Sequence, residues 1–163
     1  GEANDTAFGG VYFDTDVEVI RDITPLLDDD GFIGFENDQY VNSGQGLAAV
    51  PHHPVIRAMI NEYKKLHFTN PDGTVNTVGC PHLNSDVMER FGLVRNGREQ
   101  MVAGIHVYPA EWFNPLDSVT GKLTKTENTY SIHWYSMSWL PARIRAKTKV
   151  GRLVRRIMES RKT

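Results

Sequence analysis

The first clear pattern along the chain is an apolar run that ends in two acidic residues. In "GGVYFDTDV" the apolar positions lead to Asp14 and Asp16, which indicates a buried strand that emerges at the aspartates. "DITPLLDDDG" indicates a turn or short helix closed by Gly31. "FIGFEN" and "GLAAV" indicate two further short strands, with "NDQYVNSGQG" between them as a polar, glycine-bearing loop.

The period of the pattern changes to that of a helix in "HPVIRAMINEYKKLHF". Six apolar residues fall on one helical face, and Pro54 suits the first position: Val55, Ile56, Met59, Ile60, Tyr63 and Leu66. "HLNSDVMERFG" predicts a second helix, ended by Gly92. "GIHVYP" and "NTYSIHW" predict strands around a long irregular stretch, residues 110–127. Strands mixed with helices over one core predict an α/β fold.

Composition and charge narrow the class of protein. The chain of 163 residues, 40% hydrophobic and 23% charged, is typical of a globular protein that buries a core. Residues 143–163 hold nine of the 18 Lys and Arg and one acid, so the rest of the chain is strongly acidic. An acidic body argues against nucleic acid as a partner, because phosphate backbones need a positive surface. The single cysteine and the polar opening "GEANDTA" favour a cytoplasmic location.

The two aspartates are the first candidate for chemistry. On a strand, Tyr12, Asp14 and Asp16 would share one face, at the edge where α/β sheets bind ligands. Two neighbouring carboxylates repel each other, and a shared divalent cation relieves that repulsion. Oxygen ligands favour Mg²⁺ or Mn²⁺, completed by substrate phosphates. The alternative is a pair of exposed acids where a strand meets water.

The second candidate is "NTYSIHWYSMSW", where His133 and Trp139 flank two serines. His133 offers a nitrogen ligand that Mn²⁺ accepts, the serines offer oxygen, and an indole N–H can donate to a phosphate. The alternative is structural: a histidine with ordinary hydrogen bonds and a tryptophan in the core. Either reading fits the local sequence.

Together these segments resemble glycosyltransferase family 32, the sugar-binding-region transferases that carry a DXD motif. The group includes bacterial capsular polysaccharide and lipopolysaccharide transferases and the yeast initiation-specific mannosyltransferase. The chain has the family's features in order over about residues 8–140: "GGVYFDTDVEVI", "GFEN", "VNSGQG", "HHPVI", "GCPHL", "YPAEWF" and "YSIHWYSMSW". Their joint occurrence is far more specific than Asp-x-Asp alone.

The resemblance implies a GT-A-like fold and a metal-dependent, retaining hexosyltransferase of polysaccharide biosynthesis. Such an enzyme moves a sugar from a nucleotide diphosphate sugar to a glycan or lipid-linked acceptor, with Mn²⁺ or Mg²⁺ as cofactor. Carried over, Asp14, Asp16 and His133 would hold the metal, and Ser138 and Trp139 would contact the donor.

The resemblance also assigns Tyr12 and Glu36 to substrate binding, together with Asn42, and it adds Asp86 to the catalytic residues Asp14 and Asp16. Asn42 has a structural alternative, because it can simply shape its glycine-rich turn. Asp86 has one as well, because it can cap or decorate its helix.

Only "GEANDTAF" precedes the first "GG", where the family places a base-binding strand and helix. We therefore expect a chain that lacks the N-terminal base-binding half and that binds donor weakly alone. Two rival functions follow: an inactive metal- or carbohydrate-binding remnant, and a phosphatase-like hydrolase, which Glu18 disfavours. A retaining glycoside hydrolase would use two carboxyls about 5 Å apart.

The predicted division is a catalytic domain over residues 1–140 and a basic amphipathic helical tail over residues 141–163. Basic residues alternate with aliphatic ones in the tail. Residues 143–162 would then contact an anionic membrane peripherally, at its inner face. The alternative is a solvated helix whose apolar face packs on the domain.

Overall fold

The computed structural model describes residues 8–66, 73 and 79–136. The chain forms a mixed α/β fold around a five-stranded sheet of order β1-β4-β3-β6-β5. The strands are β1 (Gly10–Tyr12), β3 (Gly31–Asn37), β4 (Tyr40–Ala49), β5 (Gln100–Val102) and β6 (Ile105–Tyr108). β3 and β6 run parallel, and the other neighbours are antiparallel. β2 (Val17–Val19) and β7 (Ser131–His133) form a separate antiparallel ribbon.

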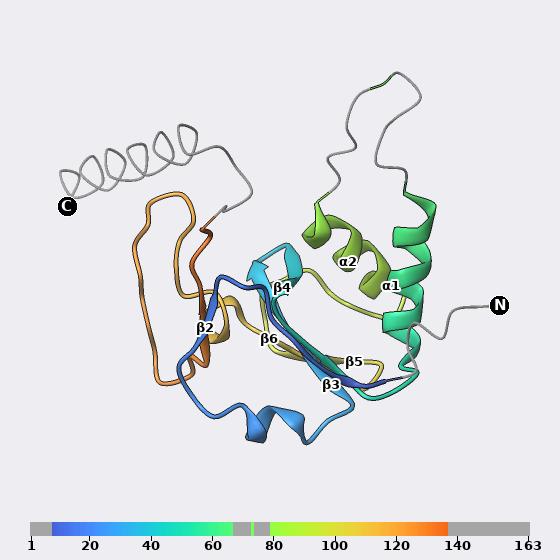
Figure 1. Ribbon diagram of the computed structural model, residues 1–163, viewed down its shortest axis with the longest axis horizontal. Helices are drawn as coiled ribbons and strands as arrows, with labels where there is room; N and C mark the ends of the chain where they lie inside the picture. The colour runs from blue at the N-terminus through green and yellow to red at the C-terminus, as the bar shows by residue number, and fades with distance from the viewer. Residues whose placement is uncertain (1–7, 67–72, 74–78, 137–163) are drawn as a thin grey trace.

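Helices α1 (Pro54–Lys65) and α2 (Cys80–Glu89) pack against each other and cover one face of the sheet (Figure 1). The core of this face is made of aliphatic side chains, methionines and the fully buried Phe35. Its members are Ile33, Phe35, Val41, Val55, Met59, Leu83, Val87, Met88, Leu93, Val102, Ile105 and Val107. Both predicted helices are confirmed. α2 begins two residues before the predicted segment "HLNSD" and ends at Glu89, before Gly92.

The opposite face is covered by short 3₁₀ turns, η1 (Thr24–Leu27) and η2 (Ala110–Trp112). Phe32 and Phe113 stack there with ring centroids 5.3 Å apart, beside Leu26 and Tyr108. Phe32 and Ile33 thus point to opposite faces, as strand alternation requires, and both are fully buried. The predicted strands at "FIGFEN", "GIHVYP" and "NTYSIHW" and the short helix at "DITPLL" are confirmed.

Two expectations about the first half of the chain are wrong. β1 is exposed along its length and ends at Tyr12, because it lies at the edge of the sheet and pairs only with β4 within the described residues. The region predicted as a polar loop, residues 37–46, lies mostly in β4. The glycines and polar residues of this region form a bulge in the strand. Ile33 pairs with Leu47, and the next residue, Gly34, pairs with Asn42. Residues 43–46 therefore bulge out of the β3–β4 ladder.

Tight local contacts fix the ends of several elements. The His53 side chain caps α1, since its Nδ1 accepts from the backbone N–H of Val55 at 3.2 Å. Its Nε2 lies 3.0 Å from the carbonyl of Ala103 in the β5–β6 hairpin. Ala103 and Gly104 have φ of 48° and 89°, which suits a two-residue turn of type I′. In the described part of the chain, no helix has the length and apolarity to cross a membrane.

The predicted basic helix after Leu140 lies outside the described residues, as does the whole of the predicted tail, residues 141–163. Ser138 and Trp139 lie outside them too. The α/β class predicted from the sequence is confirmed as a mixed α/β fold.

Candidate metal centre

Asp14 and Asp16 lie in the turn between β1 and β2. The prediction that one strand carries both aspartates is therefore wrong, because β1 ends at Tyr12. The backbone N–H of Asp14 donates to the carbonyl of Gly44 at 2.8 Å, which attaches the turn to the bulge of β4. The N–H of Val17 donates back to the carbonyl of Asp14 at 3.1 Å and reverses the chain. A turn can direct both carboxylates to one point without strand alternation.

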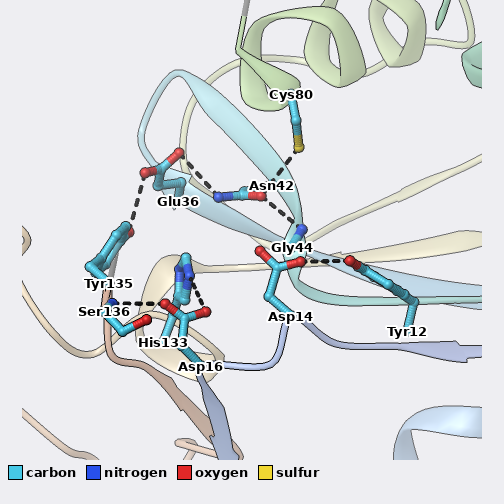
Figure 2. Close-up of polar contacts among 10 residues, drawn as sticks. All are labelled: Tyr12, Asp14, Asp16, Glu36, Asn42, Gly44, Cys80, His133, Tyr135 and Ser136. Carbon is cyan, nitrogen blue, oxygen red and sulfur yellow. Dashed lines mark hydrogen bonds and ion pairs between the residues drawn. The ribbon is translucent and has the colours of Figure 1, made fainter. Parts of the chain in front are cut away.

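Asp16 is held by the segment that follows β7. Its Oδ1 lies 3.3 Å from His133 Nε2, and its Oδ2 accepts from the backbone N–H of Ser136 at 2.8 Å (Figure 2). Its carbonyl accepts from the N–H of Trp134 at 3.0 Å. This contact is possible because β2 and β7 pair in antiparallel register, with Val17 opposite His133.

The ligand atoms of Asp14, Asp16 and His133 all lie within 4.8 Å of one another. Two carboxylates and one imidazole form a donor set that suits Mn²⁺, which accepts both oxygen and nitrogen. His133 is buried, with 7% of its surface exposed, and its Nδ1 has no hydrogen-bond partner among the described residues. A buried polar atom without a partner is rare in folded proteins. The residues present therefore fit a divalent cation.

The surroundings of Asp16 favour its charged form. Burial raises the pKa of Asp16, but the hydrogen bond from the Ser136 amide and the nearby His133 outweigh it, so the pKa lies below its ordinary value. The Tyr12 hydroxyl donates to Asp14 Oδ1 at 2.7 Å. That hydrogen bond to a carboxylate, together with burial, raises the pKa of Tyr12. Tyr12 therefore stays protonated and keeps donating to Asp14.

A second set of polar contacts extends from the cluster along β3 and β4. The backbone N–H of Gly44 donates to Asn42 Oδ1 at 2.8 Å, and Asn42 Nδ2 donates to Glu36 Oε2 at 3.5 Å (Figure 2). Glu36 Oε1 accepts from the Tyr135 hydroxyl at 3.2 Å. Glu36 and Asn42 thus lie beside the cluster of Asp14, Asp16 and His133, and Asn42 also shapes the glycine-bearing turn.

Gly44 is required by the close approach of the Asp14 carboxylate. A Cβ at this position would stand 2.3 Å from Asp14 Oδ2 and 2.9 Å from its Cγ. Only a residue without a side chain leaves that carboxylate where it is. Gly44 is therefore part of the site, although sequence reasoning treated it only as a turn residue.

Asp86 occupies a different environment from the other predicted site residues. It lies on the exposed side of α2 and pairs with Arg95 at 2.5 Å, which also pairs with Glu89 at 2.7 Å. The described contacts of Asp86 include none with Asp14, Asp16 or His133. Cys80, the first residue of α2, is half-buried, and its thiol lies 3.2 Å from Ser43 Oγ and 3.5 Å from Asn42 Oδ1.

Sequence reasoning missed Tyr135 and Ser136. The backbone N–H of Ser136 binds Asp16, and Tyr135 contacts both His133 and Glu36. Backbone donors carry no signature in the side-chain pattern, so nothing in the sequence marks Ser136. Tyr135 lies two residues after His133, and this proximity was the only signal available.

Comparisons with protein-family models, with curated proteins and with solved structures found no match to the chain. The site is therefore interpreted from its own residues and geometry.

Proposed function

We propose that the chain is a metal-dependent glycosyltransferase, with a GT-A-like fold, that uses a nucleotide diphosphate sugar and retains the anomeric configuration. One observation carries the proposal: Asp14 and Asp16 meet His133, more than a hundred residues away in sequence, with their ligand atoms within 4.8 Å. The ordered motifs in the sequence supply the reaction class. Mn²⁺ or Mg²⁺ is the proposed cofactor, with a glycan or lipid-linked acceptor.

Each residue of the site has a defined part in this proposal. Asp14, Asp16 and His133 hold the cation, which when bound would neutralise charge on the departing diphosphate. Tyr12 orients the Asp14 carboxylate, and the Ser136 amide orients that of Asp16. Glu36 presents a carboxylate beside the cluster and accepts hydrogen bonds there, as expected of a group that binds sugar hydroxyls.

The composition of the cluster favours transfer over glycoside hydrolysis. A retaining hydrolase needs two carboxyls about 5 Å apart that stand free on either side of the scissile bond. Here a buried histidine lies 3.3 Å from one of the two carboxylates, and its ligand atom lies within 4.8 Å of both. That arrangement is expected of a cation site.

The test measures release or transfer of sugar from a panel of nucleotide sugars, with and without Mn²⁺, in wild-type protein and in Asp16→Asn. We expect activity that requires Mn²⁺ and falls by at least about 100-fold in Asp16→Asn, the size of one removed electrostatic contact at a reacting centre. The matched control is Asp22→Asn, which also removes a carboxylate that accepts two hydrogen bonds, here from Thr24, but lies outside the cluster. Activity without metal, or activity that survives Asp16→Asn, would contradict the proposal.

The same panel separates the remnant from the enzyme. A chain that binds Mn²⁺ at this cluster without turnover of any nucleotide sugar would be the metal-binding remnant. Retention is tested by following the anomeric configuration of the product by NMR as it forms.

Peripheral membrane contact through residues 143–162 is part of the same proposal, for an acceptor linked to lipid. Sedimentation with liposomes tests it, with and without anionic lipid. Binding that needs anionic lipid would support electrostatic docking. Equal sedimentation with both kinds of liposome would contradict it.

A further inference from the structure

The backbone at Tyr135 is in an unusual conformation. Its φ is 49°, in the left-handed region that residues with a side chain rarely adopt. Among the described residues, His52 and Ala103 share a positive φ, and both lie in turns. Tyr135 instead lies just after β7, in a segment to which the structure assigns no helix, strand or turn. Strained residues of this kind persist where surrounding contacts hold them, often at functional sites.

The contacts of the Tyr135 side chain connect two parts of the site. Its ring lies against that of His133, with centroids 4.1 Å apart and the planes tilted by 36°. Its hydroxyl donates to Glu36 Oε1 at 3.2 Å (Figure 2). One side chain therefore restrains the imidazole of the cluster and the neighbouring carboxylate of β3.

The backbone of the same residue directs a donor to Asp16. The peptide that follows Tyr135 ends in the N–H of Ser136, which donates to Asp16 Oδ2 at 2.8 Å. On the other side, the N–H of Trp134 donates to the carbonyl of Asp16 at 3.0 Å. The left-handed φ lies between these two donors, so the local conformation decides whether both reach one aspartate.

We propose that Tyr135 is a positioning residue of the metal centre, which orients His133 through its ring and Asp16 through its backbone and couples both to Glu36. This inference rests on the proposed function, because it assigns a role toward the cation held by Asp14, Asp16 and His133. Groups that orient metal ligands commonly change metal affinity by about 10- to 100-fold when removed. Tyr135 itself lies outside the cluster of ligand atoms.

The test is a titration of the whole chain with Mn²⁺, followed by electron paramagnetic resonance, at a temperature where circular dichroism shows every variant folded. We expect Tyr135→Leu, which removes both ring and hydroxyl, to weaken binding by about 10- to 100-fold. Tyr135→Phe keeps the ring on His133 and loses the bond to Glu36. We expect it to restore most of the affinity, leaving a loss of about three- to tenfold, the typical net size of one hydrogen bond.

Tyr40 supplies a matched control. Its ring lies against His82 with centroids 4.3 Å apart and the planes tilted by 43°, which is nearly the geometry of Tyr135 and His133. Tyr40, like Tyr135, is half-buried. Tyr40→Leu therefore removes an equivalent tyrosine–histidine contact away from the cluster, and we expect its Mn²⁺ affinity to match the wild type.

Three results would overturn the inference. If Tyr135→Leu binds Mn²⁺ as the wild type does, Tyr135 does not position the ligands, although the proposed metal centre stands. If Tyr40→Leu loses as much affinity as Tyr135→Leu, the effect is general destabilisation. If the wild-type chain binds no Mn²⁺, the proposed metal centre fails and the role of Tyr135 fails with it.

Discussion

On the helix-facing side of the sheet, apolar side chains from β3, β6, α1 and α2 pack together at positions that follow strand alternation and the helical period. At the candidate metal centre, three irregular segments meet: a turn between β1 and β2, a bulge in β4 and a left-handed residue after β7. Polar contacts replace apolar burial. The helix-facing core stabilises the fold. The candidate site is built from irregular backbone segments that are connected to the strands of that core.

The largest expected effect comes from breaking the helix-facing core. Phe35 belongs to this core and is fully buried. We expect Phe35→Ala to lower the free energy of unfolding by about 3–5 kcal/mol, from lost burial and the cavity left behind. Phe8→Ala is the control, because Phe8 is 93% exposed and its truncation should leave stability nearly unchanged. Urea unfolding measures both, and equal effects would contradict the placement of Phe35.

Gly44→Ala tests the candidate metal centre. The new Cβ would meet the far end of the Asp14 side chain, which can rotate away, so we expect unfolding free energy to fall by less than about 1 kcal/mol. That rotation takes an oxygen out of the cluster, and Mn²⁺ affinity should fall by about 10- to 100-fold, or about 1.4–2.8 kcal/mol. Calorimetric titration measures it.

Gly79→Ala is the control for Gly44→Ala. A Cβ there finds its nearest neighbour at 3.6 Å, an ordinary contact, and the φ of −74° suits alanine. Its Mn²⁺ affinity should equal that of the wild type. Unchanged affinity in Gly44→Ala would show that the approach of Gly44 to Asp14 does not matter to the site.

His53→Ala tests the contact that connects α1 to the β5–β6 hairpin. The substitution removes the cap of α1 and the contact with Ala103 in the β5–β6 hairpin. We expect a loss of about 1–2 kcal/mol in thermal or urea unfolding, the range for a helix cap. His52→Asn should cost far less, since His52 is exposed and asparagine tolerates its φ of 60°. Mn²⁺ binding should be unaffected in both variants.

The smallest expected effect is the pH dependence due to Asp16. Because its pKa is lower in the folded chain, its charged form stabilises the fold above the pKa of the unfolded chain, roughly 3.9. That contribution is lost as pH falls through the lower, folded pKa. Asp16→Asn should therefore flatten the metal-free stability profile below about pH 4. An identical acid profile in both proteins would contradict the hydrogen bonds assigned to Asp16.

The helices and the helix-facing core could be predicted from the sequence because periodicity reports burial directly. Val55 and Met59 repeat at helical spacing, and both are buried on α1. The second half of β4 was predicted as the strand "GLAAV", but its first half was not, because Asn42, Ser43 and Gly44 have loop composition yet lie in a strand with a bulge. Strand pairing compensates there for weak local preference.

The candidate site was only partly predictable. Asp14, Asp16 and His133 were predicted from the sequence as metal ligands, and the structure brings their ligand atoms together. The expected reason, alternation along one strand, was wrong, since a turn carries both aspartates. The contributions of Tyr135 and the Ser136 amide depend on backbone conformation, which side-chain patterns do not encode.

Mn²⁺ titration of the wild-type chain beside Asp14→Asn tests the central claim most directly. We predict that one Mn²⁺ binds per wild-type chain. Asp14→Asn should lower the Mn²⁺ affinity by more than about 100-fold, the upper end of the effect of groups that only orient metal ligands. Asp22→Asn should bind Mn²⁺ with the wild-type affinity. A wild-type chain that binds no Mn²⁺, or an Asp14→Asn chain that binds it equally well, would contradict the metal centre.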